Sequence, residues 1–131
     1  MTVKVTAAQI IRINQHLDEC VHAVTGPSEL DGAVNAAFQT MFGQDLNETV
    51  AEKAVALLYG VAKAHAFFDG NKRTAWLTFT TFLNLNGLRF TEQISGYQDD
   101  MVVDLVEDRI TKDDVIDWIH EQVRLGRAVE L

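Results

Sequence analysis

The feature that most constrains the fold is a short polar stretch, HAFFDGNKR at residues 65–73, set between two long apolar segments. Before it, apolar residues recur three and four positions apart, which predicts a helix from about residue 47 or 49 to His65. After it, a second helix is predicted from residue 70 or 71 to Asn86. Both segments are apolar nearly all round, which is typical of enclosed, central helices. The polar stretch therefore lies at a corner that two buried helices support.

The residues of this corner suit the binding of a phosphate group. The start of the second helix offers backbone N–H groups and a partial positive charge, and Gly70 lets an oxygen approach the backbone closely. Lys72 and Arg73 add two cations. Asp69 offers carboxylate oxygens to a divalent metal, and the imidazole of His65 suits a general base. Together these groups predict a site for phosphoryl or nucleotidyl transfer.

Taken singly, the same residues have plainer interpretations. A histidine is favoured at a helix C-terminus by the helix dipole, a Lys-Arg pair is usually solvated, and Asp-Gly is a common turn. His65 and Asp69 are four residues apart, which is the spacing of a metal-binding pair on one helix face. A structural metal, however, needs three or four protein ligands. The combination in this order favours the phosphate site.

The stretch resembles the signature of the Fic/Doc superfamily. Asn71-Lys72-Arg73 resembles the Doc (death-on-curing) branch, since Fic AMP-transferases usually have glycine at the position of Lys72. The resemblance continues at Phe42-Gly43, Leu46, Thr74-Ala75, Phe82-Leu83 and Asn86-Gly87. It implies an all-α fold, a compact Fic-like bundle of about six helices with at most a small β-hairpin or flap. A single domain would span residues 1–131.

The resemblance also implies roles for individual residues. His65 would be catalytic and would take a proton from the target hydroxyl, Asp69 would position Mg²⁺, and Phe67 would anchor the loop. The nucleotide phosphates would be held by Gly70, Asn71, Lys72 and Arg73. The target would be aligned by strand addition to a flap that includes Thr40, Met41, Phe42 and Gly43. A plain helix–helix connection, with Met41 and Phe42 in the core, is the alternative for that segment.

For the whole protein, the resemblance implies the toxin of a type II toxin–antitoxin system. Such a toxin would transfer the γ-phosphate of ATP to a Ser/Thr hydroxyl of a translation factor, with elongation factor Tu as the expected target, and would arrest translation. ATP and Mg²⁺ would be required, and a cognate antitoxin would bind through a C-terminal helix. Two alternatives stay open: Fic-type transfer of AMP to a protein hydroxyl, and an inactive Fic-like binding module or corepressor.

Capping patterns and periodicity predict two helices in the N-terminal third. Thr6 opens a capping box, and apolar residues at helical spacing predict a first helix that continues to Val24. Gly26-Pro27 would end it, and Cys20 would lie on its apolar stripe. Ser28 is the predicted N-cap of a second helix.

The C-terminal third predicts one short extended piece and two helices. Residues 88–90 follow a helix-ending glycine and alternate in polarity. Apolar residues at helical spacing predict an amphipathic helix over residues 97–106, and Thr111 caps a last helix that reaches Val123. Strand signals are weak throughout, which favours a mainly helical domain.

Charge and composition restrict the partners and the compartment. The net charge of −8 argues against binding to nucleic acid or an anionic membrane, because phosphate groups would be repelled, and it suits a basic partner. One cysteine cannot form an internal disulfide, which favours a reducing compartment. No leader is visible, and no apolar run reaches the roughly 18 residues of a membrane helix. We therefore expect a cytoplasmic protein.

Overall fold

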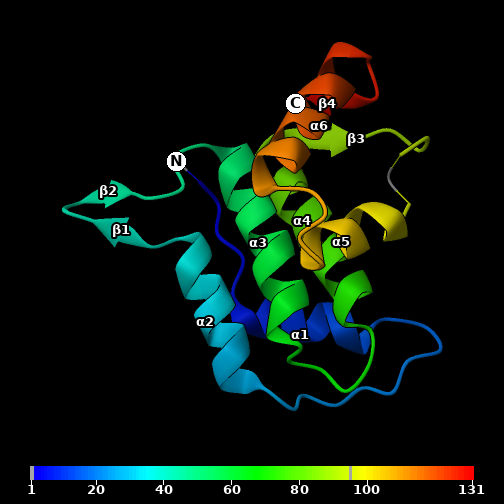
Figure 1. Ribbon diagram of the computed structural model, residues 1–131. Coiled ribbons are helices and arrows are strands. Elements are labelled where there is room, and N and C mark those ends of the chain that lie inside the picture. Colours follow the sequence, from blue (N-terminus) through cyan, green and yellow to red (C-terminus); the bar gives the residue numbers. More distant parts are fainter. Residues whose placement is uncertain (1, 95) are drawn as a thin grey trace.

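Two helices form the centre of the fold. In the computed structural model, which describes residues 2–94 and 96–131, α3 (Val50–Ala64) and α4 (Asn71–Leu85) run side by side (Figure 1). Their fully or almost fully buried apolar side chains are Ala54, Val55, Leu57, Leu58, Val61 and Ala62 of α3, and Ala75, Trp76, Phe79, Phe82 and Leu83 of α4. The prediction of two enclosed helices that meet at the polar corner is confirmed.

Further helices pack around this pair. α1 (Ala7–Gln15) contacts α4, and α2 (Pro27–Ala37) packs along α3. α5 (Asp99–Val106) and α6 (Lys112–Arg124) both contact α3. The described residues thus contain six helices, which confirms the all-α, Fic-like bundle that the sequence implied. None of these helices has the combination of length and apolar composition that crossing a membrane would require.

A two-stranded pair that the sequence did not predict holds the C-terminal end. The extended piece β3 (Leu88–Phe90) pairs antiparallel with β4 (Ala128–Glu130). Phe90 places its ring against Trp76 of α4 and Trp118 of α6, with ring centroids 6.3 and 5.4 Å away. Large aromatic rings bury much apolar surface, so this cluster ties the C-terminal segments to the central helix.

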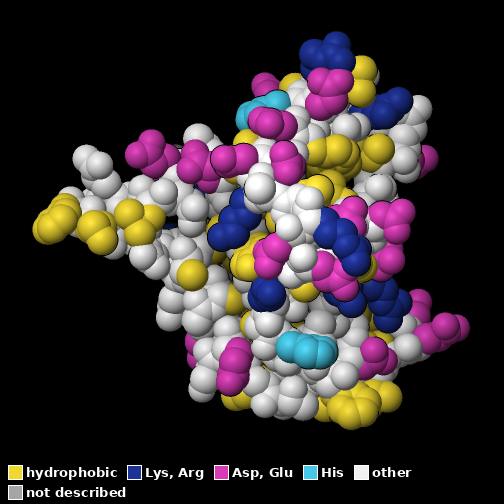
Figure 2. Space-filling model, viewed as in Figure 1, with side chains coloured by type: hydrophobic (Ala, Val, Ile, Leu, Met, Phe, Trp, Pro, Cys, Tyr) yellow, Lys and Arg dark blue, Asp and Glu magenta, His cyan; other side chains and the backbone are white. Residues whose placement is uncertain are grey.

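A β-hairpin projects from the bundle between α2 and α3. β1 (Thr40–Met41) and β2 (Gln44–Asp45) pair antiparallel, and the turn residues Phe42 and Gly43 have φ angles of 52° and 78°. Two consecutive positive φ angles are typical of the tight hairpin turns whose twist matches that of the strands. The tip is apolar and exposed, with the Phe42 side chain 98% accessible (Figure 2). A small hairpin in this segment agrees with the fold that the resemblance implied.

The hairpin lies at the opposite end of the bundle from the polar corner (Figure 1). It joins the end of α2 to the start of α3, whereas the start of α2 and the end of α3 are both at the corner. The 15 residues of α3 span about 22 Å. A partner that contacted both the hairpin and the corner would therefore have to extend along most of one helix.

The prediction that the first helix continues to Val24 is wrong. α1 ends at Gln15, and the chain continues as a loop over residues 16–25. The reason is that this loop pairs with the corner: the N–H of Phe68 donates to the carbonyl of Ala23, and Val24 forms an antiparallel bridge with Phe67. A residue in such a bridge has extended backbone, so Val24 cannot belong to a helix. Cys20 consequently lies in this loop, half-buried, and not on a helical stripe.

The predicted start of the second helix is also wrong, by two residues. Gly26 is the N-cap and Pro27 is the first helical residue, so Ser28 lies inside the first turn. Proline is favoured there because it has no N–H to leave unpaired and its fixed φ suits a helix. The proline that was expected to separate the two helices instead begins the second.

The buried Lys53 offers a test of how the hairpin is held. Its ammonium donates to the carbonyls of Asn47 and Glu48 and pairs with Asp45 of β2 at 3.0 Å. We predict that Lys53→Met lowers the free energy of unfolding by about 2–3 kcal/mol, since charged hydrogen bonds are lost and two carbonyls lose a partner. Hydrogen exchange of the backbone amides in residues 40–45 should become faster, because the hairpin loses its ion pair with residue 53.

The matched control is Lys63→Met on the exposed end of the same helix. Chemical denaturation measures the free energy of unfolding of both variants, and hydrogen exchange measures the protection of their hairpin amides. Equal losses of stability, or unchanged exchange in the hairpin of Lys53→Met, would contradict the anchoring role.

Candidate active site

The corner between α3 and α4 is a tight reversal with a left-handed residue at each end. His65 is the C-cap of α3 with φ 49°, and Gly70 is the N-cap of α4 with φ 77°. Between them, Ala66 and Phe67 are almost completely buried, and Phe67 belongs to the main core cluster. Burial of these two apolar residues fixes the loop to the core, so that its polar residues are left at the surface.

The loop over residues 16–25 forms a floor beneath the corner. A Cβ atom on Gly70 would lie only 2.7 Å from Cδ1 of Leu17 and 3.0 Å from Sγ of Cys20. This crowding comes in addition to the positive φ, which residues with a side chain adopt reluctantly. The position where α4 begins therefore accepts glycine alone without strain.

Asn14 of α1 supports the corner from below. Its side chain is 1% exposed, and its Nδ2 donates to the carbonyl oxygen of Asp69 at 2.9 Å and to Oγ1 of Thr74 at 3.1 Å. In a planar trans peptide the carbonyl and the following N–H point in opposite directions. Because the Asp69 carbonyl is held towards α1, the N–H of Gly70 faces the other way, towards the outer side of the corner.

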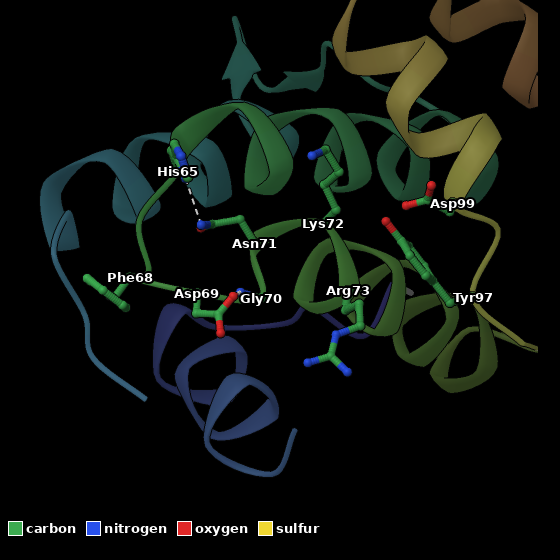
Figure 3. Close-up of a pocket in the computed structure, with 9 residues that line it drawn as sticks. All are labelled: His65, Phe68, Asp69, Gly70, Asn71, Lys72, Arg73, Tyr97 and Asp99. Atoms are coloured by element: carbon green, nitrogen blue, oxygen red, sulfur yellow. Dashed lines mark hydrogen bonds between the residues drawn. The ribbon is translucent and has the colours of Figure 1, made fainter. Parts of the chain in front are cut away.

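Asn71 connects the loop to the histidine. Its Oδ1 accepts from the N–H of Phe67 at 3.0 Å, and its Nδ2 donates to the carbonyl of Phe67 at 2.8 Å. These two bonds fix which end of the amide is nitrogen. The remaining N–H of Nδ2 points at Nδ1 of His65, 2.6 Å away (Figure 3). Nδ1 is therefore an acceptor, and a neutral His65 carries its proton on Nε2.

One cavity of about 380 Å³ contains almost the whole predicted site. It is lined by His65, Phe68, Asp69, Gly70, Asn71, Lys72, Arg73, Tyr97 and Asp99 (Figure 3). The catalytic, metal and phosphate-binding residues that the sequence suggested are thus brought together around a shared space. Phe67 is buried beneath it. The suggested flap residues, 40–43, do not line it and lie at the far end of α3.

The charged side chains of the cavity differ in how firmly their contacts fix them. Lys72 is exposed, whereas Arg73 is half-buried and donates to the carbonyl of Asp18 in the floor loop at 3.1 Å. The Asp69 carboxylate accepts from the N–H of Gly70 at 2.8 Å and from that of Val21 at 3.4 Å. A carboxylate already bonded at the start of α4 indicates that this position favours negative charge, as expected for a helix N-terminus.

The metal-binding capacity of the site rests on Asp69. In residues 2–94 and 96–131, no group of three or more His, Cys, Asp or Glu side chains is placed to hold a metal ion. A metal bound at one carboxylate has to take its other ligands from water and from the substrate. That donor set suits Mg²⁺, which keeps several waters and commonly binds phosphate oxygens.

Three residues at the site were missed by sequence reasoning. Asn14 is a buried polar residue four positions after Ile10, on the apolar face of α1, and an asparagine on such a face could have been noticed. Tyr97 and Asp99 reach the cavity from the start of α5, more than twenty residues from the corner. Nothing in the local sequence marks these two.

Comparisons with known proteins agree on one family. A sequence profile described as "Fic/DOC family" matches residues 4–83. Toxin Doc of Mycolicibacterium smegmatis is 39% identical over 90 residues, which cover 69% of this chain and 67% of that protein. No solved structure gives a significant match.

The crowding around Gly70 leads to a first prediction for the site. Gly70→Ala should lower the free energy of unfolding by about 1–3 kcal/mol more than Gly126→Ala does. Gly126 is the matched control because its φ of 72° is similar but no atom lies within 4 Å of its added Cβ. Thermal or chemical denaturation measures both. Equal losses would mean that backbone strain alone, and not contact with the floor loop, restricts position 70.

A second prediction for the site concerns the hydrogen bonds of Asn71. Long-range ¹H–¹⁵N NMR spectra should show the neutral ring of His65 entirely as the Nε2–H tautomer. Asn71→Ala should remove that exclusive preference. It should also destabilise the fold by about 1–3 kcal/mol for each buried Phe67 backbone group left unpaired. Asn84→Ala, at an exposed position of the same helix, is the control. A wild-type ring protonated on Nδ1 would contradict the assignment.

Proposed function

Because this chain belongs to the Fic/DOC family, on its Doc branch, we propose that it is the toxin of a type II toxin–antitoxin system. The proposed reaction is transfer of the γ-phosphate of ATP to a serine or threonine hydroxyl of a translation factor, with elongation factor Tu as the first candidate. The similarity to a protein named Toxin Doc supports the toxin assignment. The choice of reaction rests on the chemistry of the cavity.

The observation that carries the proposal is the shared cavity of His65, Lys72 and Arg73 at the start of α4. A polyphosphate chain needs cations and N–H donors, and a hydroxyl nucleophile needs a base beside it. Both needs are met here within one space of about 380 Å³. Placement of the reacting groups on two buried helices supplies the rigidity that catalysis by positioning requires.

In the proposed step, the target hydroxyl oxygen forms a bond to the γ-phosphorus while the bond from that phosphorus to the bridging oxygen breaks. ADP leaves, the target gains a phosphate, and the hydroxyl proton passes to the ring of His65. Because Nδ1 of His65 accepts from Asn71, proton uptake needs either release of that hydrogen bond or a change of tautomer. The Asn71 contact therefore has to change when the target binds.

Mg²⁺ fits the donors that the chain provides, as the lone Asp69 carboxylate leaves room for phosphate and water ligands. When bound, the ion would neutralise part of the phosphate charge. Lys72 and Arg73 would also neutralise part of the phosphate charge. The N–H of Gly70, which now donates to the Asp69 carboxylate, would be free to donate to a phosphate oxygen once that carboxylate binds the metal.

Target binding is proposed to use the projecting hairpin together with the cavity. An extended target segment added to β1 or β2 would gain backbone hydrogen bonds, and the exposed apolar tip at Phe42 would give it side-chain contact. Since α3 separates the hairpin from His65 by about 22 Å, roughly seven extended residues would bridge the two. A basic target would suit the net charge of −8. The cognate antitoxin, binding through a C-terminal helix, would silence the protein.

Transfer of AMP is the second candidate reaction, because the same residues can bind either end of a triphosphate. In that reaction the α-phosphorus would face the nucleophile and pyrophosphate would leave. Lys72 weighs against it, because Fic AMP-transferases usually have glycine at this position, and a long cation would crowd the path of their triphosphate. An inactive binding module is disfavoured by the complete set of base, carboxylate and cations in one cavity.

The proposal predicts where a radioactive label goes. Purified protein incubated with a translation extract should label a protein from γ-labelled ATP and not from α-labelled ATP. His65→Asn should reduce labelling by about 100-fold or more, as expected for loss of a general base. Asparagine is chosen because it tolerates the left-handed backbone of residue 65.

His120→Asn, on the exposed side of α6, is the control and should label normally. Thermal unfolding of both variants separates loss of chemistry from loss of fold. Label from the α position alone would favour AMP transfer, and tight ATP binding without transfer to any protein would favour the inactive binding module. Full activity of a folded His65→Asn would exclude His65 as the base.

A further inference from the structure

Tyr97 and Asp99 line the end of the cavity that lies away from His65 (Figure 3). Asp99 is the first residue of α5 and Tyr97 lies two residues before it, and both lie beyond residues 4–83, the part of the chain that the family profile matches. The Tyr97 hydroxyl lies beside the Asp99 carboxylate. In Figure 3, Lys72 and Arg73 lie between this pair and the corner, so the cavity has two chemically different ends.

The Tyr97–Asp99 end is unsuited to a phosphate group. A carboxylate repels a phosphate, and α5, the short helix that begins there, already has Asp99 and Asp100 in its first turn. Within the described ranges, Asp99 has no ion-pair partner. Burial, followed by the adjacent Asp99 carboxylate, raises the pKa of the Tyr97 hydroxyl. A tyrosine hydroxyl is protonated at neutral pH, so it can donate to that carboxylate. One such donor would use only part of the accepting capacity of Asp99 and would leave the rest for a ligand.

The ligand group that suits such an end is a neutral one that donates hydrogen bonds. An ionised carboxylate has two oxygens with about four acceptor positions, and a vicinal diol offers two O–H donors at matching separation. Carboxylates hold ribose hydroxyls in this way in other nucleotide-binding folds. The half-buried ring of Tyr97 adds an apolar surface beside the carboxylate, which suits the sugar or the base.

We propose that Tyr97 and Asp99 form a subsite for the ribose hydroxyls of the nucleotide. The proposal rests on the function proposed above, since it takes the ligand of the cavity to be a nucleoside triphosphate. Asp99 accepts hydrogen bonds from the sugar, and Tyr97 holds the carboxylate in place. The polyphosphate then extends across Lys72 and Arg73 towards the start of α4.

This placement sets the direction of the nucleotide. With the sugar at Asp99, the phosphate farthest from the sugar lies nearest to His65, so the γ-phosphorus and not the α-phosphorus faces the incoming hydroxyl. Electrostatics favours the same direction, because the terminal phosphate carries the most negative charge and the start of α4 with its adjacent cations is the more positive end. The subsite would therefore select phosphate transfer over AMP transfer.

The test compares three ligands that differ in the sugar alone or lack it. Isothermal titration in the presence of Mg²⁺ measures the binding of ATP, 2′,3′-dideoxy-ATP and inorganic tripolyphosphate. We expect the wild-type protein to bind ATP about tenfold more tightly than dideoxy-ATP, in line with charged hydrogen bonds. Asp99→Asn should bind ATP and dideoxy-ATP almost equally, while its affinity for tripolyphosphate should stay at the wild-type value or rise slightly.

Asp100→Asn is the matched control. Asp100 is exposed, is the next residue of the first turn of α5, and does not line the cavity. This variant makes the same change of charge at the same helix end, so it should keep the wild-type preference for ATP. Tyr97→Phe, which removes only the hydroxyl partner, should reduce the preference without abolishing it. Thermal unfolding of each variant verifies that the fold is intact.

The outcomes separate this proposal from the proposed function. Equal affinity of the wild-type protein for ATP and dideoxy-ATP, or an equal loss in Asp99→Asn and Asp100→Asn, would overturn the subsite and leave phosphate transfer in place. The expected sugar preference without label transfer from ATP would support the subsite and overturn the proposed reaction. Absence of binding by all three ligands would overturn both.

Discussion

The site depends on the hydrogen bonds that hold the backbone of Phe67. On one side the side-chain amide of Asn71 bonds to both backbone groups of Phe67, and on the other side the neighbouring Ala66 carbonyl and Phe68 N–H bond to the loop over residues 16–25. A loop of buried backbone has to satisfy its polar groups internally, and this one does so with the first residue of α4 and with a segment some forty residues earlier in the chain. The left-handed conformations of His65 and Gly70 persist because the loop between them is held from both directions.

The same hydrogen bonds link fold to chemistry. Asn71 fixes the loop and also faces Nδ1 of His65, and Asn14 fixes the Asp69 carbonyl and so directs the N–H of Gly70 outwards. Neither side chain needs to touch a substrate to influence one. The groups that would touch a substrate, Lys72 above all, are more exposed and less constrained. The hydrogen bonds of Asn14 and Asn71 thus hold the backbone from which these groups extend, which is the support that a binding site requires.

The sequence predicted those parts of the structure that depend on local pattern. The two central helices, their meeting at residues 65–73 and the all-α class follow from periodicity, which reports burial directly. The end of α1 was mispredicted because Leu17 and Cys20 continue the apolar spacing, although their contacts are with Gly70 and not with a helix neighbour. Tyr97 and Asp99 could not be predicted as part of the site, since their place in the cavity follows only from the packing of α5 against the central helices.

The candidate site depends on three stretches of chain: residues 14–26 support the corner from below, residues 65–73 supply the cations and the histidine, and Tyr97 and Asp99 line the far end of the cavity. During translation the chain leaves the ribosome from its N-terminus. The floor therefore exists before the groups it supports, and the wall formed by Tyr97 and Asp99 is added late. A nascent chain that has emerged only through the corner holds the histidine and the cations without the far wall of the cavity, so the candidate site is complete only after α5 has emerged and packed against the central helices.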